Sequence, residues 1–317
     1  RIYYESRLAK VELSESGRRL VEELDKELAA DDMNDVQKAK AKWTQLEALI
    51  GSPSRVNIIA KDIVTHFEQR QSVFEGKAMV VAMSRRIAAE LYDAIIAIRP
   101  EWHSDDLAKG AIKVVMTTAS SDGVAISKHH TTKEQRRALA ERMKDPNDEL
   151  KLVIVRDMWL TGFDVKCLSC LYLDKPLKAH TLMQTIARAN RVAEGKSNGL
   201  IIDYIGIVKA LRKALADYTA NVGGGSTDPT IDKGELIERV LETIAAATEF
   251  LKSKEFDLDD LIYAKDFAKI SLLLTAANAV SDSRESKKQF MTYGNELNRM
   301  MKYLDRDDIS KADRERK

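Results

Sequence analysis

Two arginines and a glutamine repeat at a spacing that places them on one face of an α-helix. Gln184, Arg188 and Arg191 point the same way when successive residues rotate by about 100°. The apolar residues on the opposite side, which also repeat at helical spacing, are Leu182, Ile186 and Ala189. Guanidinium groups are permanently charged, and their forked N–H donors match pairs of phosphate oxygens. The polar face is therefore a candidate phosphate-binding surface, although a solvated helix face has the same pattern.

A second candidate group follows an apolar run at 152–155. Thr161 offers a hydroxyl to a phosphate or a ribose, and Gly162 allows a ligand to approach the backbone. Asp164 can accept a hydrogen bond from a ribose hydroxyl or orient an arginine. The same three residues are typical of a tight turn stabilised by an aspartate, so both interpretations stay open.

Three short patterns imitate nucleotide or nuclease sites. Residues 195–197 resemble the end of a phosphate-binding loop, but Asn190 occupies the position of its first glycine and the segment precedes a strand. Asp203 ends an apolar run as a magnesium-binding aspartate would, yet without a phosphate loop a structural role is favoured. The Glu-Gly-Lys segments at 75–77 and 194–196 match the Glu-x-Lys of many nucleases, but tripeptides this short recur by chance.

Cysteine and histidine give no metal site. Cys167 and Cys170 form a C-x-x-C pair, but a zinc site needs four ligands and there is no second pair. Both lie in an apolar, strand-like stretch, which favours buried structural cysteines. His129 and His130 lie in a polar loop without an evident carboxylate partner, so a surface pair is the preferred interpretation. No metal-binding residue is predicted.

The elements that must position these residues alternate between strands and helices. Apolar runs typical of strands buried on both faces occur at 78–83, 112–116, 152–155, 170–173 and 200–202. Helical periodicity follows several of them, at 87–98, 132–144 and 179–191. Strands of this kind joined by helices favour a parallel sheet covered on both sides. Residues 77–220 are therefore predicted to form one α/β domain.

The flanking regions are predicted to be mostly helical. Residues 1–76 form a helical lead-in that opens on a short extended run at 2–4 and ends near Gly76. The glycine-rich segment 221–230 is typical of a flexible linker. Beyond it, residues 231–317 show helical periodicity and no strand-like run, and the polar residues from 305 onward are expected to be a solvated tail.

Composition narrows the class of protein. The 317 residues are 44% hydrophobic and 32% charged, which is typical of a chain with a buried core. Lys and Arg number 51 against 50 Asp and Glu, so a uniformly basic nucleic-acid-binding surface is excluded, but a local basic strip is not. Two cysteines suit a reducing compartment, and no run approaches the ~18 apolar residues of a membrane span. These features predict a cytoplasmic protein without a membrane partner.

The order of the polar segments resembles motifs IV to VI of superfamily 2 helicases. The segments that carry the resemblance are Ser84-Arg85, Thr117-Thr118-Ala119-Ser120, Thr161-Gly162-Phe163-Asp164 and the Gln184-x-x-x-Arg188-x-x-Arg191 helix. Ala187 stands where many members have glycine, a small change. More narrowly, residues 182–192, followed by 199–206 and preceded by 2–9, resemble the motor (R) subunit of type I restriction-modification enzymes.

That resemblance implies a second RecA-like motor domain and a role for each segment. Arg188 and Arg191 would be arginine fingers that reach ATP on the first motor domain, and Gln184 would support them. Thr161, Gly162 and Asp164 would couple nucleotide and DNA contacts. The residues expected to contact the DNA backbone are Ser84, Arg85, Thr117 and Thr118.

The resemblance also implies the parent activity and its partners. The parent would use ATP and Mg²⁺, bound mainly by the first motor domain, to pump duplex DNA and then cleave it away from the recognition site. The chain is expected to be a C-terminal piece, inactive alone because the phosphate loop and nuclease site would lie upstream. Its helical C-terminus is expected to dock the methyltransferase (M) and specificity (S) subunits. The alternatives are another superfamily 2 helicase or remodeller, or a non-catalytic assembly platform.

Overall fold

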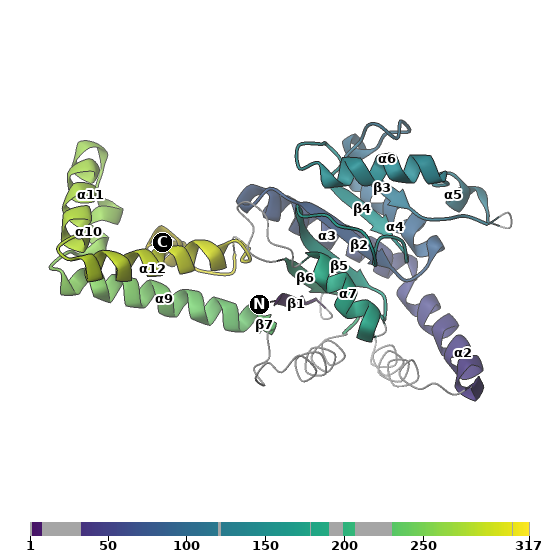
Figure 1. Cartoon of the computed structure of the whole chain (residues 1–317), viewed down its shortest axis with the longest axis horizontal. Helices are drawn as coiled ribbons and strands as arrows, with labels where there is room; N and C mark the ends of the chain where they lie inside the picture. Colours follow the sequence, from purple (N-terminus) through teal and green to yellow (C-terminus); the bar gives the residue numbers. More distant parts are fainter. Residues whose placement is uncertain are drawn as a thin grey trace. The chain divides into compact units, whose positions relative to one another are not determined.

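The computed structural model describes residues 2–7, 33–119, 122–177, 179–189, 199–206, 230–305 and 307–316. The chain divides into two compact units, Arg1–Thr230 and Ile231–Lys317. Figure 1 shows the first as an α/β unit and the second as helices. The predicted linker at 221–230 lies outside the described residues except for Thr230, where the short strand β7 (Thr230–Asp232) begins.

The first unit is built on a parallel sheet whose strands follow the order β3-β4-β2-β5-β6-β1. The strands are β1 (Ile2–Ser6), β2 (Lys77–Ala82), β3 (Ile112–Val115), β4 (Leu152–Val155), β5 (Leu168–Asp174) and β6 (Leu200–Asp203). Strands β2 to β6 are buried along their whole length, as expected when helices cover both faces. The α/β class predicted from the apolar runs is confirmed, and the parallel order is consistent with a RecA-like fold.

Helices follow the strands and begin where the sequence provides caps. They are α2 (Met33–Ile50), α3 (Pro53–Val73), α4 (Arg85–Ile98), α5 (Val124–Ser127), α6 (Lys133–Lys144) and α7 (Ala179–Ala189). Pro53 occupies the first turn of α3, where its missing N–H does no harm. Thr132 and Gln135 form a capping box at the start of α6. Helix α4 contacts α3 and strands β2, β3 and β4, whereas α7 contacts β5 and β6.

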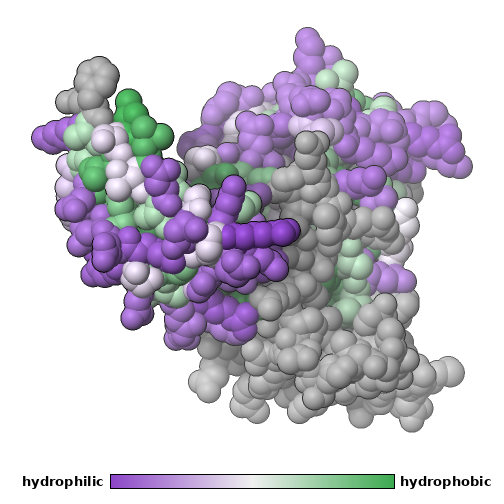
Figure 2. All heavy atoms as spheres, turned by 60° about the vertical axis from the view of Figure 1, so that its left-hand side comes forward, coloured by the Kyte–Doolittle hydropathy of each residue, from purple (hydrophilic) through white to green (hydrophobic). Residues whose placement is uncertain are grey.

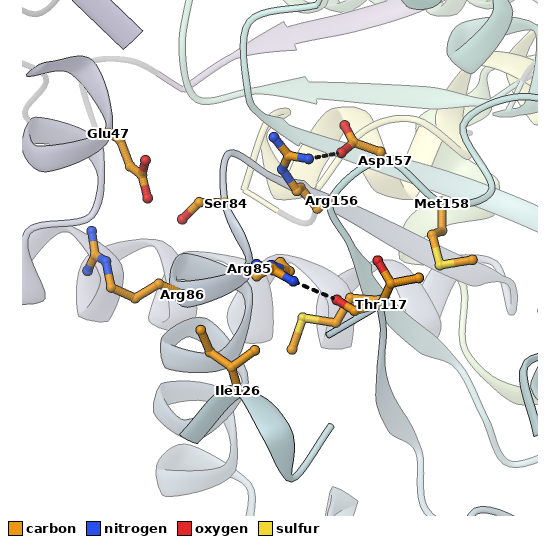
Figure 3. A pocket seen from close by; sticks show the side chains of 10 residues that line it. Glu47, Ser84, Arg85, Arg86, Thr117, Ile126, Arg156, Asp157 and Met158 are labelled. Atoms are coloured by element: carbon orange, nitrogen blue, oxygen red, sulfur yellow. Dashed lines mark hydrogen bonds and ion pairs between the residues drawn. The ribbon is translucent and has the colours of Figure 1, made fainter. Parts of the chain in front are cut away.

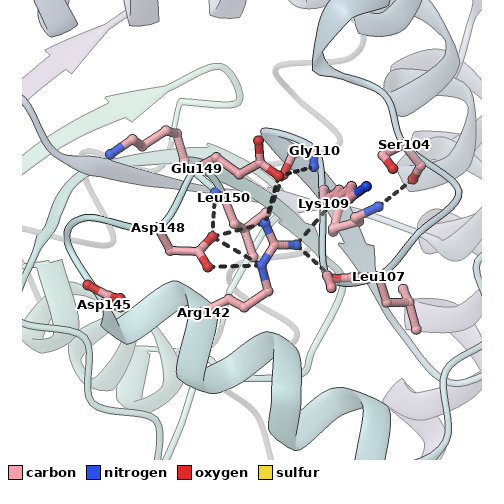
Figure 4. A network of polar contacts seen from close by, with 12 residues as sticks. Ser104, Leu107, Lys109, Gly110, Arg142, Asp145, Asp148, Glu149 and Leu150 are labelled. Carbon is pink, nitrogen blue, oxygen red and sulfur yellow. Dashed lines mark hydrogen bonds and ion pairs between the residues drawn. The ribbon is translucent and has the colours of Figure 1, made fainter.

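Arg142 of α6 fixes the two loops that lead into β3 and β4 (Figure 4). Its guanidinium pairs with Asp148 at 2.9 Å and donates to the Leu107 carbonyl at 2.7 Å. It also donates to the carbonyls of Lys109 and Gly110, both at 3.2 Å. Because the side chain is nine-tenths buried, these bonds hold the start of both strands in one place.

Residues near the start of the chain belong to the same compact unit as the sheet. The sequence predicts a helical lead-in over 1–76, whereas β1 pairs with β6, with Tyr4 opposite Ile201. The Tyr4 hydroxyl donates to Asp203 at 2.5 Å. No local pattern in the sequence indicates this pairing, because the two strands are about two hundred residues apart. Residues 8–32 of the predicted lead-in lie outside the described residues.

Buried ion pairs also attach α3 to the sheet. Arg55 pairs with Asp174, at the end of β5, at 2.7 Å and donates to the Tyr204 carbonyl at 3.0 Å. Arg7 pairs with Asp62 of α3 at 2.8 Å. Both arginines are at least nine-tenths buried, and Arg7 also pairs with Glu5, so it is removal of Asp174 that would leave an unpaired charge in the interior. Helix α3 is thus an integral layer of the α/β unit.

The second unit is helical. Its helices are α9 (Lys233–Ser253), α10 (Leu258–Tyr263), α11 (Asp266–Val280), α12 (Arg284–Met301) and α13 (Lys311–Arg316). Helices α9 and α12 pack together, and Val240 and Leu297 are among their buried residues. The tail from residue 305 contains the short helix α13, which has no buried residue and whose Arg316 pairs with Asp259 of α10 at 3.0 Å. Among the residues that the structure describes, no helix combines the length and apolar character that a membrane crossing requires.

Candidate functional site

A pocket of about 410 Å³ opens at the carboxyl ends of β2, β3 and β4 (Figure 3). The residues that line it are Ser84, Arg85 and Arg86 after β2, Met116 and Thr117 after β3, Arg156, Asp157 and Met158 after β4, with Glu47 of α2 and Ile126 of α5. The strand order changes direction at β2, because β3 and β4 lie on one side of it and β5 on the other. Ligands of open parallel sheets bind at such a point. Three of the four residues predicted to contact DNA, all except Thr118, therefore meet in one pocket.

Ser84 and Arg85 are held at the pocket by the start of α4. Ser84 is the N-cap of α4, and its hydroxyl accepts a hydrogen bond from the Ile87 N–H at 3.3 Å. Arg85 Nη1 donates to the Thr117 carbonyl at 3.3 Å and pairs with Asp122 at 2.8 Å. The Arg85 side chain is 32% exposed, so it is anchored at one nitrogen and still accessible. The positive end of the α4 dipole adds to the attraction for an anion.

Thr118 differs from its neighbour. The Thr117 residue lines the pocket, whereas the Thr118 hydroxyl hydrogen-bonds His130 Nδ1 at 2.6 Å. Thr118 is thus engaged with the loop before α6 and is not among the residues that line the pocket. Ser120, of the same predicted motif, lies outside the described residues.

Arg156 lines the pocket, although the sequence motifs do not predict it as a site residue. It follows the last residue of β4 directly, and its side chain is 44% exposed. Its guanidinium pairs with Asp157, which also pairs with Lys175 Nζ. Lys175 is buried, which lowers its pKa, and the Asp157 carboxylate opposes that effect. A polar residue within two positions of the end of a buried strand was the available signal, since Ser84 and Thr117 are the second residues after β2 and β3.

The charges around the pocket are mixed, because each of its three arginines is paired with a carboxylate. Arg86 pairs with Glu90 of its own helix at 2.9 Å, and Glu47 adds a carboxylate from α2. Three arginines line the pocket against two acidic residues, Glu47 and Asp157. An arginine has five N–H donors, and the described contacts of Arg85 and Arg156 use Nη1. Chemically, this arrangement is suited to bind and orient phosphate oxygens.

The predicted turn at Thr161 lies beside the pocket-lining segment, but its residues are not among those that line the pocket. Gly162 has φ 71° and Thr161 is exposed. Trp159, at φ 68°, stacks on buried Phe163 with ring centroids 4.2 Å apart. A bulky residue at positive φ is strained, and the stacked rings stabilise that conformation. Asp164 is half-buried and has interaction partners, so the turn interpretation and the ligand interpretation both remain predictions.

The arginine helix is only partly described. Leu182, Ile186 and Ala189 of α7 are buried, which confirms the predicted apolar face. Gln184 is half-buried. Arg188 belongs to α7, but its side chain, like the whole of Arg191, lies outside the described residues. Their predicted role as arginine fingers stays a prediction.

The structural interpretations of Cys170 and Asp203 agree with their surroundings. Burial raises the pKa of the Cys170 thiol to about 12, so it remains protonated at neutral pH. Asp203 Oδ1 accepts from the Ile205 and Gly206 N–H groups, both at 2.8 Å, while Oδ2 accepts from Tyr4. A carboxylate engaged in this way stabilises a strand end and is poorly placed to bind magnesium.

Comparison with known proteins identifies the family. Residues 65–206 match the family model described as type I restriction enzyme subunit R domain 3. The chain is 53% identical over 182 residues, 56% of its length, to the type I restriction enzyme HindI endonuclease subunit of Haemophilus influenzae. It is 36% identical over 297 residues, 92% of its length, to the protein named for the MjaIXP endonuclease subunit of Methanocaldococcus jannaschii.

The match covers only part of each relative. The chain spans 17% of the Haemophilus protein and 27% of the Methanocaldococcus protein. Among solved structures, a fragment assigned to the HsdR subunit of a type I restriction enzyme from Vibrio vulnificus YJ016 has a TM-score of 0.40 and 16% identity. That match covers 74% of this chain and 37% of the other. On the sequence matches, the chain belongs to the family of type I restriction enzyme R subunits.

Proposed function

We propose that this chain provides the second motor half of an R subunit, which holds the backbone of duplex DNA while ATP hydrolysis drives translocation and cleavage away from the recognition site. The observation that carries the proposal is the pocket at the ends of β2, β3 and β4. It joins Ser84, Arg85 and Thr117, which the sequence predicted as DNA contacts, with Arg156.

The chemistry of the pocket suits a phosphate backbone. Arginines, a hydroxyl and a helix N-terminus contact phosphate oxygens without reading bases. Binding of this kind is independent of sequence and releases counterions, so it weakens as salt rises. A motor that moves along DNA needs binding that is independent of sequence, because it must hold every sequence equally well.

ATP and Mg²⁺ would be held mainly by another motor domain. The residues of this chain that fit an ATP phosphate are Arg188 and Arg191, whose positive charge would offset the charge that develops during phosphoryl transfer. Gln184 would support them, and Thr161, Gly162 and Asp164 would couple nucleotide and DNA contacts. Asp203 does not fit Mg²⁺, because both of its carboxylate oxygens accept hydrogen bonds within the protein.

The intact R subunit, assembled with its partner subunits, tests the DNA proposal. Its affinity for duplex DNA is measured between about 50 and 200 mM salt, for the wild type and Arg85→Ala. Loss of one phosphate contact lowers the slope of log K against log salt by about 0.9. Arg137→Ala, which removes an exposed arginine of α6 outside the pocket, is the matched control. An unchanged slope for Arg85→Ala would contradict the proposal and favour a non-catalytic platform.

For the helical unit, exposed apolar side chains favour docking of the M and S subunits. Tyr263, Ile270, Leu273, Leu274 and Met291 are each at least half exposed, and Figure 2 shows hydrophobic residues at the surface. Apolar patches of this kind mark interaction sites. Leu274→Ser is expected to weaken co-purification with the M and S subunits. Val124→Ser, which changes an exposed apolar residue of the α/β unit, should leave co-purification intact.

A further inference from the structure

Lys175 connects two strands that are not neighbours. It follows β5 directly, and its Nζ donates to the carbonyl of Arg156, which follows β4, at 3.0 Å. Strand β2 lies between β4 and β5 in the sheet. The lysine side chain therefore spans the carboxyl end of β2, where Ser84 and Arg85 begin the pocket.

The charges around Lys175 leave a positive group at the pocket. Asp157 pairs with both Lys175 and Arg156. The Lys175 side chain is 6% exposed, whereas that of Arg156 is 44% exposed. A single carboxylate shared by two cations leaves one positive charge, and the accessible member of the group is Arg156. Without Lys175, the Asp157 carboxylate would pair only with Arg156 and would cancel its positive charge.

Burial of an ammonium group is costly unless its partners are well placed. Lys175 lies against the backbone and side chain of the segment that carries Arg156, and it lies too deep to bind DNA itself. Its hydrogen bond to a main-chain carbonyl fixes that segment, not only a flexible side chain. A buried lysine with these partners is suited to hold another residue in place.

We propose that Arg156 is a second phosphate-binding residue of the pocket, in addition to Arg85. Lys175 is the positioning residue that fixes the Arg156 main chain and shares the Asp157 carboxylate, so that the positive charge of Arg156 is not cancelled. The ligand is the phosphate backbone of duplex DNA, so this inference rests on the proposed function above. Arg85 is held by Asp122 and the Thr117 carbonyl, and Arg156 by Asp157 and Lys175. The pocket thus has two arginines for phosphate, and contacts within the protein fix each of them.

The experiment uses the intact R subunit assembled with its partners and measures duplex DNA affinity against salt. Arg156→Ala is expected to lower the slope by about 0.9, the value for one phosphate. Lys175→Met should lower it by a similar amount, although Lys175 is buried. The double variant should lose no more slope than Arg156→Ala, because both changes remove the same contact. Lys133→Met, at an exposed lysine of α6, should leave the slope unchanged.

A merely structural role for Lys175 predicts a different result. It would lower stability without changing the slope, so an unchanged slope in folded Lys175→Met overturns the positioning role. Additive losses in the double variant also overturn it. If Lys175→Met does not fold, Lys175→Gln keeps a donor for the Arg156 carbonyl and should still lose slope, because Asp157 then neutralises Arg156. If Arg85→Ala lowers the slope but Arg156→Ala does not, this inference fails while the proposed function stands. An unchanged slope in both variants contradicts both the inference and the proposed function.

Discussion

In the α/β unit several charged side chains are fully buried, whereas in the helical unit the charged side chains are partly or wholly exposed and several large apolar side chains are exposed. Every buried charged residue among those described lies in the first unit. Arg55 and Asp174 are 5% and 2% exposed, but Lys254 and Asp282 of the helical unit are 24% and 47% exposed. Leu274 of the helical unit is 64% exposed.

The difference indicates that the α/β unit fixes the positions of its elements, whereas the helical unit offers a surface for contact with another protein. A buried ion pair stabilises little by itself, but it fixes the position of the elements that it joins. In the α/β unit Arg55–Asp174 lies at the end of β5 and Arg7–Asp62 lies beyond the end of β1, so both pairs fix α3 against the sheet. The helical unit has exposed pairs such as Lys254–Asp282, and it has exposed apolar side chains, which suit contact with another protein.

The largest expected effect is on ATP hydrolysis, and it is caused by a change in the first unit. Arg191→Ala in the intact R subunit should lower DNA-stimulated ATP hydrolysis on the order of 10³-fold, because arginine fingers contribute that much to phosphoryl transfer. Turnover is measured with DNA affinity as a check that binding survives. Arg137→Ala, at an exposed arginine of α6, should keep full turnover. A loss of only a few-fold would mean that the polar helix face is solvated and would favour the platform alternative.

The meeting of Ser84, Arg85 and Thr117 could be predicted from the sequence, whereas the role of Lys175 could not. The first three follow apolar runs, and the carboxyl ends of parallel strands share one edge of the sheet. Lys175 reaches Arg156 only because β2 separates β4 from β5, and strand order depends on packing that no local pattern reveals. The helix with Arg188 was predicted from periodicity alone, and its buried face agrees.

A smaller effect sharpens the contrast between buried and exposed pairs. Asp174→Ala should lower the free energy of unfolding of the α/β unit by about 3–5 kcal/mol, since it leaves Arg55 charged and buried. Asp282→Ala removes the partner of Lys254 in the helical unit and should cause no measurable change. Urea denaturation followed by hydrogen exchange in each unit would measure both. Equal losses would contradict the comparison.

The smallest expected effect concerns pH and again lies in the α/β unit. Burial, with help from Lys128, lowers the pKa of His129 to about 4, and Asp93 opposes the shift. Between about pH 6.5 and 4 the unfolded chain therefore binds the extra proton, and stability falls as pH falls. The contribution lost between pH 7 and pH 5 is about 1–2 kcal/mol. His129→Gln should lose less stability than the wild type over that interval, in urea titrations at both values; an identical loss would mean that His129 is already solvated.

The pairing of β1 with β6 has a consequence for synthesis on the ribosome. Tyr3 lies opposite Leu200, so β1 cannot pair with β6 until almost two hundred further residues have been made. At about 5–20 residues per second this interval lasts roughly 10–40 s. During that time β1 and the open edge of the sheet are exposed to other chains, and chaperones have their longest opportunity to bind. Codon choice and translation speed before residue 200 should therefore influence the yield of folded protein more strongly than the same changes after it.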